Sequence, residues 1–312
     1  MNILACVAAA LFSAGALSAA AEPASPPADH DPRKDLGALD NLSADTVLQA
    51  AALIRRGKVY SLAIPTSSRT VAYGSRNYQI HVAPIFIGND STYGANRLQG
   101  FDDVIISHLG VGTQIDGFAH VAIDGRHYNG VETKDVIRPE GALRYGVETI
   151  PPIVGRGVLL DMVAAAAPGG RAPNAAFNRR ELEAAAARQG VRLGKGDIVL
   201  LHTGHLIPED NDYRQDLQQV AGLGVEGAEY LAGLGVVAVG MDAWIPDAMP
   251  AERKEDFLPV HGTLLVKHGV HILENIRTAE LAADKAYEFF FVLAAPRLAG
   301  AVQSVVHPVA IR

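Results

Sequence analysis

The chain has 312 residues, and 49% of them are hydrophobic, which is enough to bury a substantial core. It carries 34 acidic and 27 basic residues, a formal net charge of −7, and no run of Lys or Arg. This balance argues against a surface that follows nucleic-acid phosphates, so we expect a small-molecule substrate and no nucleic-acid partner. The single cysteine, Cys6, excludes a disulfide framework and a cysteine-based zinc site within one chain.

The first 21 residues contain no Asp, Glu, Lys or Arg, and an apolar stretch in them leads to small residues ahead of Glu22. This pattern is typical of a secretory signal peptide and is too short and too rich in Ala, Gly and Ser for a membrane helix. We interpret residues 1–21 as a signal peptide, 22–40 as a Pro-rich tether and 41–312 as a single domain. The predicted location is periplasmic or secreted, with no stable membrane insertion after cleavage.

The rest of the chain alternates predicted helices and strands. Ser43 precedes an apolar-periodic stretch that ends at Gly57, and Asn178 with Glu181 forms a box-like cap for a helix that ends at Gly190. Further along the chain, strands are predicted over 197–202, 236–241 and 287–293, with a helix over 225–234. Strands that alternate with helices predict an α/β fold.

Common nucleotide-binding and serine-hydrolase signatures are absent. No G-x-G-x-x-G follows a predicted strand, and Gly222-Leu-Gly224 is interpreted as a turn that enters a helix. The chain also lacks G-x-x-x-x-G-K-[ST] and G-x-S-x-G. The chemistry must therefore be sought in other polar clusters.

The densest group of candidate ligands lies between His108 and His120. Gln114 and Asp116 are two positions apart, so on an extended segment both side chains point to one face, and His120 can reach that face after a turn at Gly117. An amide oxygen, a carboxylate and an imidazole suit Zn²⁺, Mn²⁺ or a similar ion. The alternative is that Asp116 caps a turn and His120 is a satisfied core histidine.

Later segments add to this group. His261 and Glu274 would be presented from two adjacent elements. Asp242 and Trp244 lie at or just after the end of the strand predicted over 236–241, where an α/β fold usually places its pocket. None of these residues is specific alone.

Together, these residues resemble a known family. Residues 110–120 read G-V-G-T-Q-I-D-G-F-A-H, which is similar to the motif H-x-G-T-H-x-D-x-P-x-H of the cyclase-type metal-dependent hydrolases. This family includes bacterial kynurenine formamidase, isatin hydrolase and trans-dienelactone hydrolase, and the G-T-Q-x-D form resembles one of its branches. The resemblance covers about 102–312. It implies an α/β fold of the swivelling β/β/α kind, with a β-barrel-like core flanked by helices, and a homodimer or higher homo-oligomer.

The resemblance also implies a ligand set. In relatives with two metals, the ligands are two histidines, the Asp, a later His and a later Glu. Gly110 stands at the first of these positions and Gln114 at the second. The implied cofactor is therefore one divalent ion, Zn or Mn, held by Gln114, Asp116 and His261, with Glu274 as a further ligand or as support for one.

His120 stands at the motif's last histidine, which implies a catalytic proton-transfer role. Phe118, Asp242 and Trp244 are predicted to bind substrate, with ordinary core packing as the alternative for the two aromatic residues. The function implied is a metal-dependent hydrolase that opens a small lactone, cyclic amide or aryl formamide with metal-activated water. A polyketide-type cyclase or dehydratase on the same fold, and a non-catalytic binding protein with a lapsed metal site, stay open as alternatives.

Overall fold

The computed structural model of the chain describes residues 32–85, 92–166, 176–209 and 212–312. The predicted signal peptide and most of the predicted tether lie outside the described residues. The end of that tether is folded, because Gly37–Asn41 forms a 3₁₀ helix, η2, in which Leu39 is buried. The Ala38 backbone N–H also donates to the Gly269 carbonyl at 2.7 Å. The folded domain therefore begins before residue 41.

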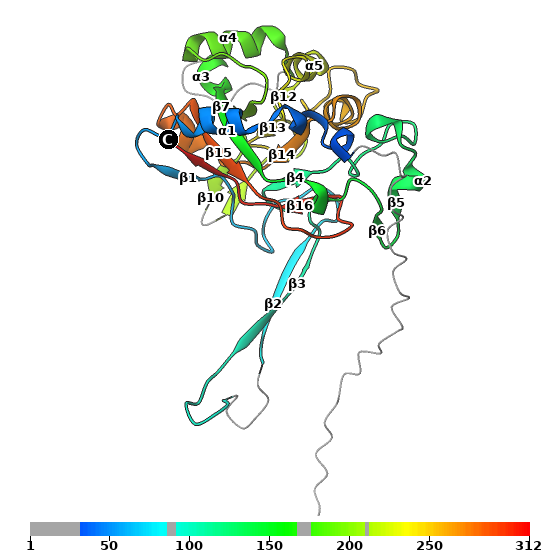
Figure 1. Cartoon of the computed structure of the whole chain (residues 1–312), viewed down its shortest axis with the longest axis vertical. Coiled ribbons are helices and arrows are strands. Elements are labelled where there is room, and N and C mark those ends of the chain that lie inside the picture. Colours follow the sequence, from blue (N-terminus) through cyan, green and yellow to red (C-terminus); the bar gives the residue numbers. More distant parts are fainter. Residues whose placement is uncertain (1–31, 86–91, 167–175, 210–211) are drawn as a thin grey trace, which may run out of the picture. The chain divides into compact units, whose positions relative to one another are not determined.

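A nine-stranded sheet, curled like half a barrel, forms the centre of the domain (Figure 1). Its strand order is β1-β17-β15-β7-β9-β13-β14-β4-β16. Strands β7, β9, β13 and β14 run parallel, and the outer strands pair antiparallel. The bounds are β1 (Val59–Ser61), β4 (Gln114–Asp116), β7 (Ile153–Asp161), β9 (Ile198–His202), β13 (Ala238–Met241), β14 (His271–Glu274), β15 (Glu288–Leu293), β16 (Gln303–Val305) and β17 (Val309–Ile311).

Helices flank this sheet, so the predicted α/β fold with a barrel-like core is confirmed. The α-helices are α1 (Ala44–Ala51), α2 (Thr133–Val136), α3 (Met162–Ala166), α4 (Arg179–Gln189), α5 (Val225–Gly233), α6 (Pro259–His261) and α7 (Ala279–Ala283). Helix α6 continues into the π-helix η5 (Gly262–His268), and η1 (Pro32–Asp35), η3 (Tyr128–Gly130) and η4 (Val147–Thr149) are further 3₁₀ helices. Among the described residues, no helix has the length and apolar character needed to cross a bilayer.

The helix starts follow the capping signals of the sequence. The Ser43 hydroxyl accepts from the Thr46 backbone N–H, and the Glu181 carboxylate accepts from the Asn178 backbone N–H. Helix α4 stops at Gly190, whose φ of 70° is a left-handed conformation that favours glycine. The predicted helix starts at Ser43 and Asn178 are thus confirmed.

The predicted end of the first helix at Gly57 is wrong. Helix α1 stops at Ala51, because the Leu53 and Ile54 N–H groups donate to carbonyls three residues back and form a turn.

Strands β7 and β9 divide the core in two. Their successive side chains point to opposite faces of the sheet. Leu159 and Leu200 therefore belong to one buried cluster, and Leu160 and Leu201 to the other. Because both faces are covered, β7 from Gly157 to Leu160 and β9 from Ile198 to Leu201 are continuous apolar runs. This double burial gives the sheet the rigidity to hold polar side chains at its edge.

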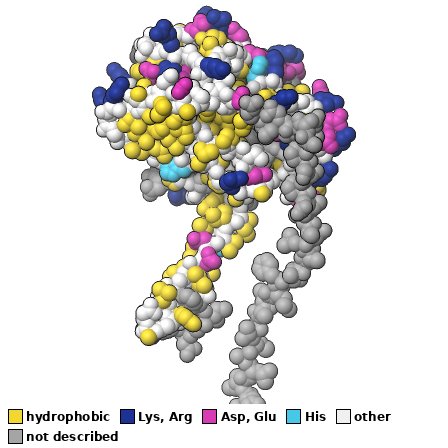
Figure 2. All heavy atoms as spheres, in the orientation of Figure 1, with side chains coloured by type: hydrophobic (Ala, Val, Ile, Leu, Met, Phe, Trp, Pro, Cys, Tyr) yellow, Lys and Arg dark blue, Asp and Glu magenta, His cyan; other side chains and the backbone are white. Residues whose placement is uncertain are grey.

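Four small two-stranded sheets complete the described fold. They are β2 (Tyr78–Pro84) with β3 (Phe101–Ser107), β5 (Ile137–Arg138) with β6 (Gly141–Ala142), β8 (Ala176–Phe177) with β12 (Gly222–Leu223), and β10 (Ile207–Glu209) with β11 (Asp212–Arg214). The β2–β3 hairpin differs from the rest because nearly all of its residues are exposed. Figure 2 shows hydrophobic side chains along its length.

One ion-pair network joins the sheet to the turn before β9. Arg156 of β7 donates to both carboxylate oxygens of Asp197, at 2.9 and 2.8 Å, and to Glu288 of β15 at 2.8 Å. The Asp197 side chain is only 4% exposed. Arg156 therefore has a structural role, and it compensates a nearly buried charge.

Replacing Arg156 by Gln should destabilise the fold. The change leaves the Asp197 carboxylate buried with weaker partners, which costs about 2–3 kcal/mol. Urea unfolding at neutral pH measures this loss. Arg180→Gln is the matched control, because the Arg180 side chain is 92% exposed in its pair with Glu181 and should change stability by less than about 0.5 kcal/mol. Equal stability of the two variants would contradict the structural role.

Candidate metal centre

The register of three strands gathers polar side chains on one face of the sheet. Gln114 and Asp116 occupy alternate positions of β4, as the sequence predicts. Antiparallel β14 places Glu274 opposite Gln114, and antiparallel β16 places Gln303 opposite Asp116. Because directly opposed residues face the same side, these four side chains lie together, and all are buried.

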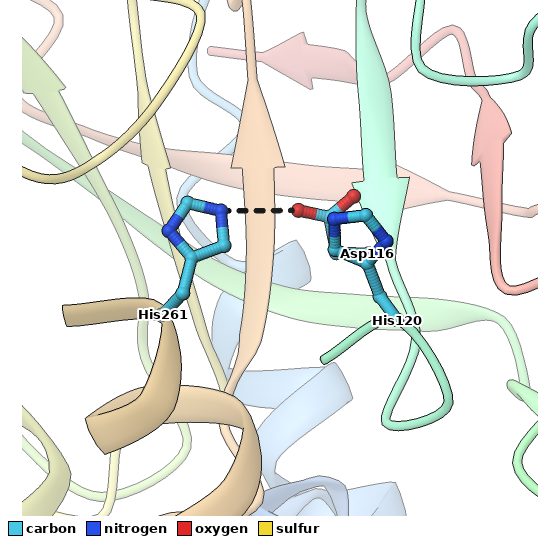
Figure 3. A group of neighbouring side chains, drawn as sticks. All are labelled: Asp116, His120 and His261. Carbon is cyan, nitrogen blue, oxygen red and sulfur yellow. Dashed lines mark ion pairs between the residues drawn. The ribbon is translucent and has the colours of Figure 1, made fainter. Parts of the chain in front are cut away.

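Two histidines complete the group from outside the sheet. The His261 Nε2 atom, at the end of α6, lies 3.8 Å from the Asp116 carboxylate and 3.3 Å from the Glu274 carboxylate. His120 reaches the group from the loop after β4. Asp116, His120 and His261 each offer one ligand atom, and these three atoms lie within 4.8 Å of one another (Figure 3).

Two buried oxygens in this group lack hydrogen bonds. Gln114 Oε1 and Asp116 Oδ2 have no hydrogen-bond partner among the described residues. Leaving a buried acceptor unsatisfied costs about 1–3 kcal/mol, so such atoms call for a missing donor or cation. Carboxylate, amide oxygen and imidazole are together a donor set for Zn²⁺ or Mn²⁺. The residues present therefore fit a divalent ion held by Gln114, Asp116 and His261.

Asp247 orients His261 for this task. Its carboxylate lies 2.6 Å from His261 Nδ1 and accepts from the Val260 backbone N–H at 2.7 Å. A carboxylate on one ring nitrogen fixes the tautomer and leaves Nε2 free to bind metal. Asp247 could not be found from the sequence, because no motif links it to His261; a bridge between Asp247 and Leu223 of β12 helps to place it.

The electrostatics of the group point to a missing positive charge. The Asp116, Asp247 and Glu274 carboxylates, all buried, surround one imidazole. Burial lowers the pKa of His261, but Asp247 and Glu274 outweigh this effect and hold that pKa well above its ordinary value. Burial, with the Asp116 charge, raises the pKa of Glu274 to about 8. A divalent cation would relieve the repulsion among these carboxylates.

His120 differs from His261 in its surroundings. Burial lowers its pKa below the ordinary value, and this effect outweighs the attraction of Asp116. The imidazole is therefore neutral near pH 7 and able to accept a proton. Its position also allows it to act as a ligand, because it belongs to the cluster of possible ligand atoms.

Phe118, the first of the residues predicted to bind substrate, packs against other aromatic rings. The Phe118 ring stacks on His271 at 4.3 Å between centroids and contacts Tyr128 at 4.8 Å, within the core. The chain leaves β4 after Asp116, so the alternation that would place Phe118 beside Asp116 ends there. The structure thus brings the predicted ligands and His120 together but places Phe118 in a separate aromatic cluster.

Asp242 and Trp244 follow β13. The Asp242 carboxylate accepts from the Thr203 N–H and hydroxyl and from the Gly204 N–H, at 2.7–2.8 Å, and so holds the turn after β9. Trp244 stacks face to face on Tyr73, with centroids 4.9 Å apart. Its indole N–H is buried without a partner among the described residues.

Two residues that the sequence analysis missed fill the space beside Gly110. Arg76 Nη1 donates to the Gly110 carbonyl at 3.2 Å, and the Gln303 amide, suitably oriented, accepts from the Gly110 N–H and donates to Asp116, each at 3.2 Å. A Cβ atom on Gly110 would lie 2.5 Å from the Gln303 amide and 2.7 Å from Arg76 Nη1. A larger residue at this position therefore requires both side chains to move.

Comparison with known proteins gives the family. The model of the Cyclase family, described as "Putative cyclase", matches residues 60–248. The chain belongs to the cyclase family. This membership confirms the resemblance drawn from the segment 110–120, and the matched range includes Gln114, Asp116 and His120.

Solved structures share the cyclase fold. A novel cyclase is 29% identical with a TM-score of 0.76, and the match covers 91% of this chain and 97% of that chain. Isatin hydrolase A from Labrenzia aggregata is 17% identical with a TM-score of 0.57, covering 84% and 94%. A potential metal-dependent hydrolase with cyclase activity is 19% identical with a TM-score of 0.53, covering 81% and 98%. A search of curated proteins finds no match.

Changing Asp247 should weaken metal binding without removing a ligand. We expect Asp247→Asn to lower the affinity of the purified chain for Zn²⁺ or Mn²⁺ by about 10–100-fold, because the carboxylate no longer supports His261. Competition with a chromophoric chelator measures this affinity. Glu255→Gln, an exposed carboxylate outside the centre, is the control. Unchanged affinity in Asp247→Asn would contradict the orienting role.

Proposed function

We propose that the protein is a metal-dependent hydrolase that opens a small lactone, a cyclic amide or an aryl formamide. The observation that carries this proposal is the pair of buried, unpartnered oxygens on Gln114 and Asp116 beside His261. Membership of the cyclase family supports it, and so does the fold shared with proteins named as metal-dependent and isatin hydrolases.

The side chains of the centre divide the work of hydrolysis. When bound, a divalent ion supplies Lewis-acid chemistry: it polarises a carbonyl and acidifies water. Gln114, Asp116 and His261 would hold the ion, and Asp247 keeps His261 in the right tautomer. His120 accepts the proton of the attacking water and returns it to the departing nitrogen or oxygen as the bond to the carbonyl carbon breaks.

A cyclase or dehydratase is the second candidate. The solved structure that is 29% identical to this chain is named a cyclase. In a cyclase or dehydratase reaction, a metal ion in the same centre would stabilise an enolate. In that reaction His120 would take a proton from carbon rather than from water. Incorporation of ¹⁸O from labelled water into the product separates the two, because only hydrolysis requires it.

Metal content and hydrolysis test the leading proposal together. We expect about one Zn or Mn per purified chain, lost in Asp116→Ala and in His261→Ala. Formanilide, isatin and an aryl lactone are the first substrates to screen. We expect His120→Ala to keep its metal but lose about 10²–10⁴-fold in kcat, the usual share of a positioned acid–base group. Wild-type protein that binds no metal and gains no hydrolysis with added Zn²⁺ or Mn²⁺ would refute the enzyme and leave a binding protein.

We also propose that the protein is exported and acts in the periplasm or outside the cell. The support is the sequence alone, since residues 1–21 have the features of a signal peptide. Amino-terminal sequencing of the protein from the native cell locates the cleavage site.

We further propose a homodimer in which the β2–β3 hairpin contacts a second copy. The cross-strand pair Ile80–Ile105 lies on one face of the hairpin, and Val104 and Ile106 lie on the other. These four residues are 48–59% exposed. Five further large apolar residues in or next to the two strands are 53–70% exposed: Val82, Ile85, Tyr93, Leu98 and Phe101. A two-stranded ribbon is marginally stable alone, so both faces favour a partner.

Apolar surface and charge support a second copy as the partner. The exposed apolar side chains of the hairpin form a hydrophobic surface that a second copy would cover. The hairpin also carries Asp102 and Asp103, and Arg55 and Arg56 are exposed. One chain thus offers both halves of a self-complementary contact.

Charging the hairpin should abolish the dimer. We expect the wild-type chain to sediment as a dimer and Val104→Asp/Ile106→Asp as a folded monomer, because buried carboxylates would oppose the contact. Phe257→Asp is the control, since Phe257 is 67% exposed outside the hairpin. A monomeric wild type, or a dimeric double variant, would contradict the proposal.

A further inference from the structure

A buried hydrogen bond links the start of β4 to the end of β14, beside the candidate centre. Thr113 directly precedes Gln114, and Asn275 directly follows Glu274. The Thr113 hydroxyl donates to the Asn275 carbonyl at 2.6 Å. Both residues are buried, so this bond is shielded from competing water. The backbone next to Gln114 is therefore tied to the backbone next to Glu274.

The Thr113 hydroxyl acts as a donor and as an acceptor. Besides donating to Asn275, it accepts from the Ile64 backbone N–H at 2.9 Å. A hydroxyl has a single hydrogen to donate, so its donor capacity is fully used. The Thr113 carbonyl also accepts from the Val306 N–H, directly after β16, at 2.9 Å. Thr113 thus joins the start of β4 to three other segments of the chain.

Asn275 uses every one of its polar groups. Its backbone N–H donates to the Ala243 carbonyl at 2.8 Å, and its side-chain amide donates to the Gly112 carbonyl at 2.9 Å. Its amide oxygen accepts from Gln215 Nε2 at 2.8 Å. The φ of Asn275 is 54°, in the left-handed region that asparagine adopts more readily than most residues. These contacts hold the end of β14 in one conformation.

The alignment of β4 with β14 determines whether Gln114 and Glu274 meet. The two residues are directly opposite in the antiparallel pair, and a slip of one residue would turn one side chain to the other face. We propose that Thr113 and Asn275 form a clamp that holds Gln114 and Glu274 in position for a metal ion. Both act through their neighbours and not on the ion, so they are positioning residues. This inference rests on the proposed function.

Two substitutions of Thr113 test the clamp, because valine has nearly the shape of threonine and lacks only the hydroxyl. We expect Thr113→Val to lower the affinity of the purified chain for Zn²⁺ by about 10–100-fold, the usual loss when the support of a metal ligand is removed. Competition with a chromophoric chelator measures this affinity. Thr113→Ser keeps the hydroxyl and should restore most of the affinity, which a role in packing alone does not predict.

Asn275→Gly tests the other half of the clamp. Glycine adopts a positive φ without strain, so this change removes the contacts of the side chain with Gly112 and Gln215 and spares the backbone. We expect a loss of Zn²⁺ affinity in the same direction. Arg156→Gln is the control, because it destabilises the fold away from the centre and should keep its affinity. Circular dichroism shows which variants fold, and Asn275→Gly replaces Thr113→Val if the latter does not.

Hydrogen exchange in the metal-free protein tests the clamp apart from metal binding. We expect the amides of 112–116 and 272–276 to exchange faster in Thr113→Val than in the wild type or Thr113→Ser, with no change over β7 and β9. Equal Zn²⁺ affinity in the wild type and the folded clamp variants would overturn the clamp and leave the proposed function standing. A wild type that binds no metal refutes the proposed function, and unchanged exchange would then overturn the clamp as well.

Discussion

Three buried carboxylates around one imidazole are the constraint on which the candidate centre depends. Asp116, Asp247 and Glu274 all approach His261, and each is almost fully removed from solvent. The effective penalty for burying an ion is several kcal/mol, and one imidazolium compensates one charge. Without a cation, Glu274 takes up a proton, as its pKa of about 8 shows. That crowding of carboxyl groups, with two oxygens beside it that lack hydrogen bonds, is the physical reason to place a divalent cation here.

The sheet provides the rigidity that this crowding requires. Strands β9, β13 and β14 are apolar and buried, so their positions are determined by packing on both faces. Strand β4 is held between β14 and β16, which places Gln114 and Asp116 without any loop. His261 comes from a helix and is oriented by Asp247. Ligands on rigid elements, supported by a second layer of contacts, are the arrangement that metal sites need.

Two side chains from distant segments of the chain fill the space beside Gly110. Arg76 and Gln303 occupy the volume that a larger residue would take. A positive charge there offsets part of the negative charge of the buried carboxylates, and it opposes the rise in the pKa of Glu274.

The sequence by itself determined the family and the α/β class and indicated the candidate ligands, because these depend on local patterns. Period-two spacing put Gln114 and Asp116 on one face, and capping residues located the starts of α1 and α4. Tertiary structure alone decided the roles of Asp247, Gln303 and Arg76, since each contacts the centre through space and not through a motif. It also decided the surroundings of Phe118, because strand alternation stops where β4 ends and side-chain direction then follows packing.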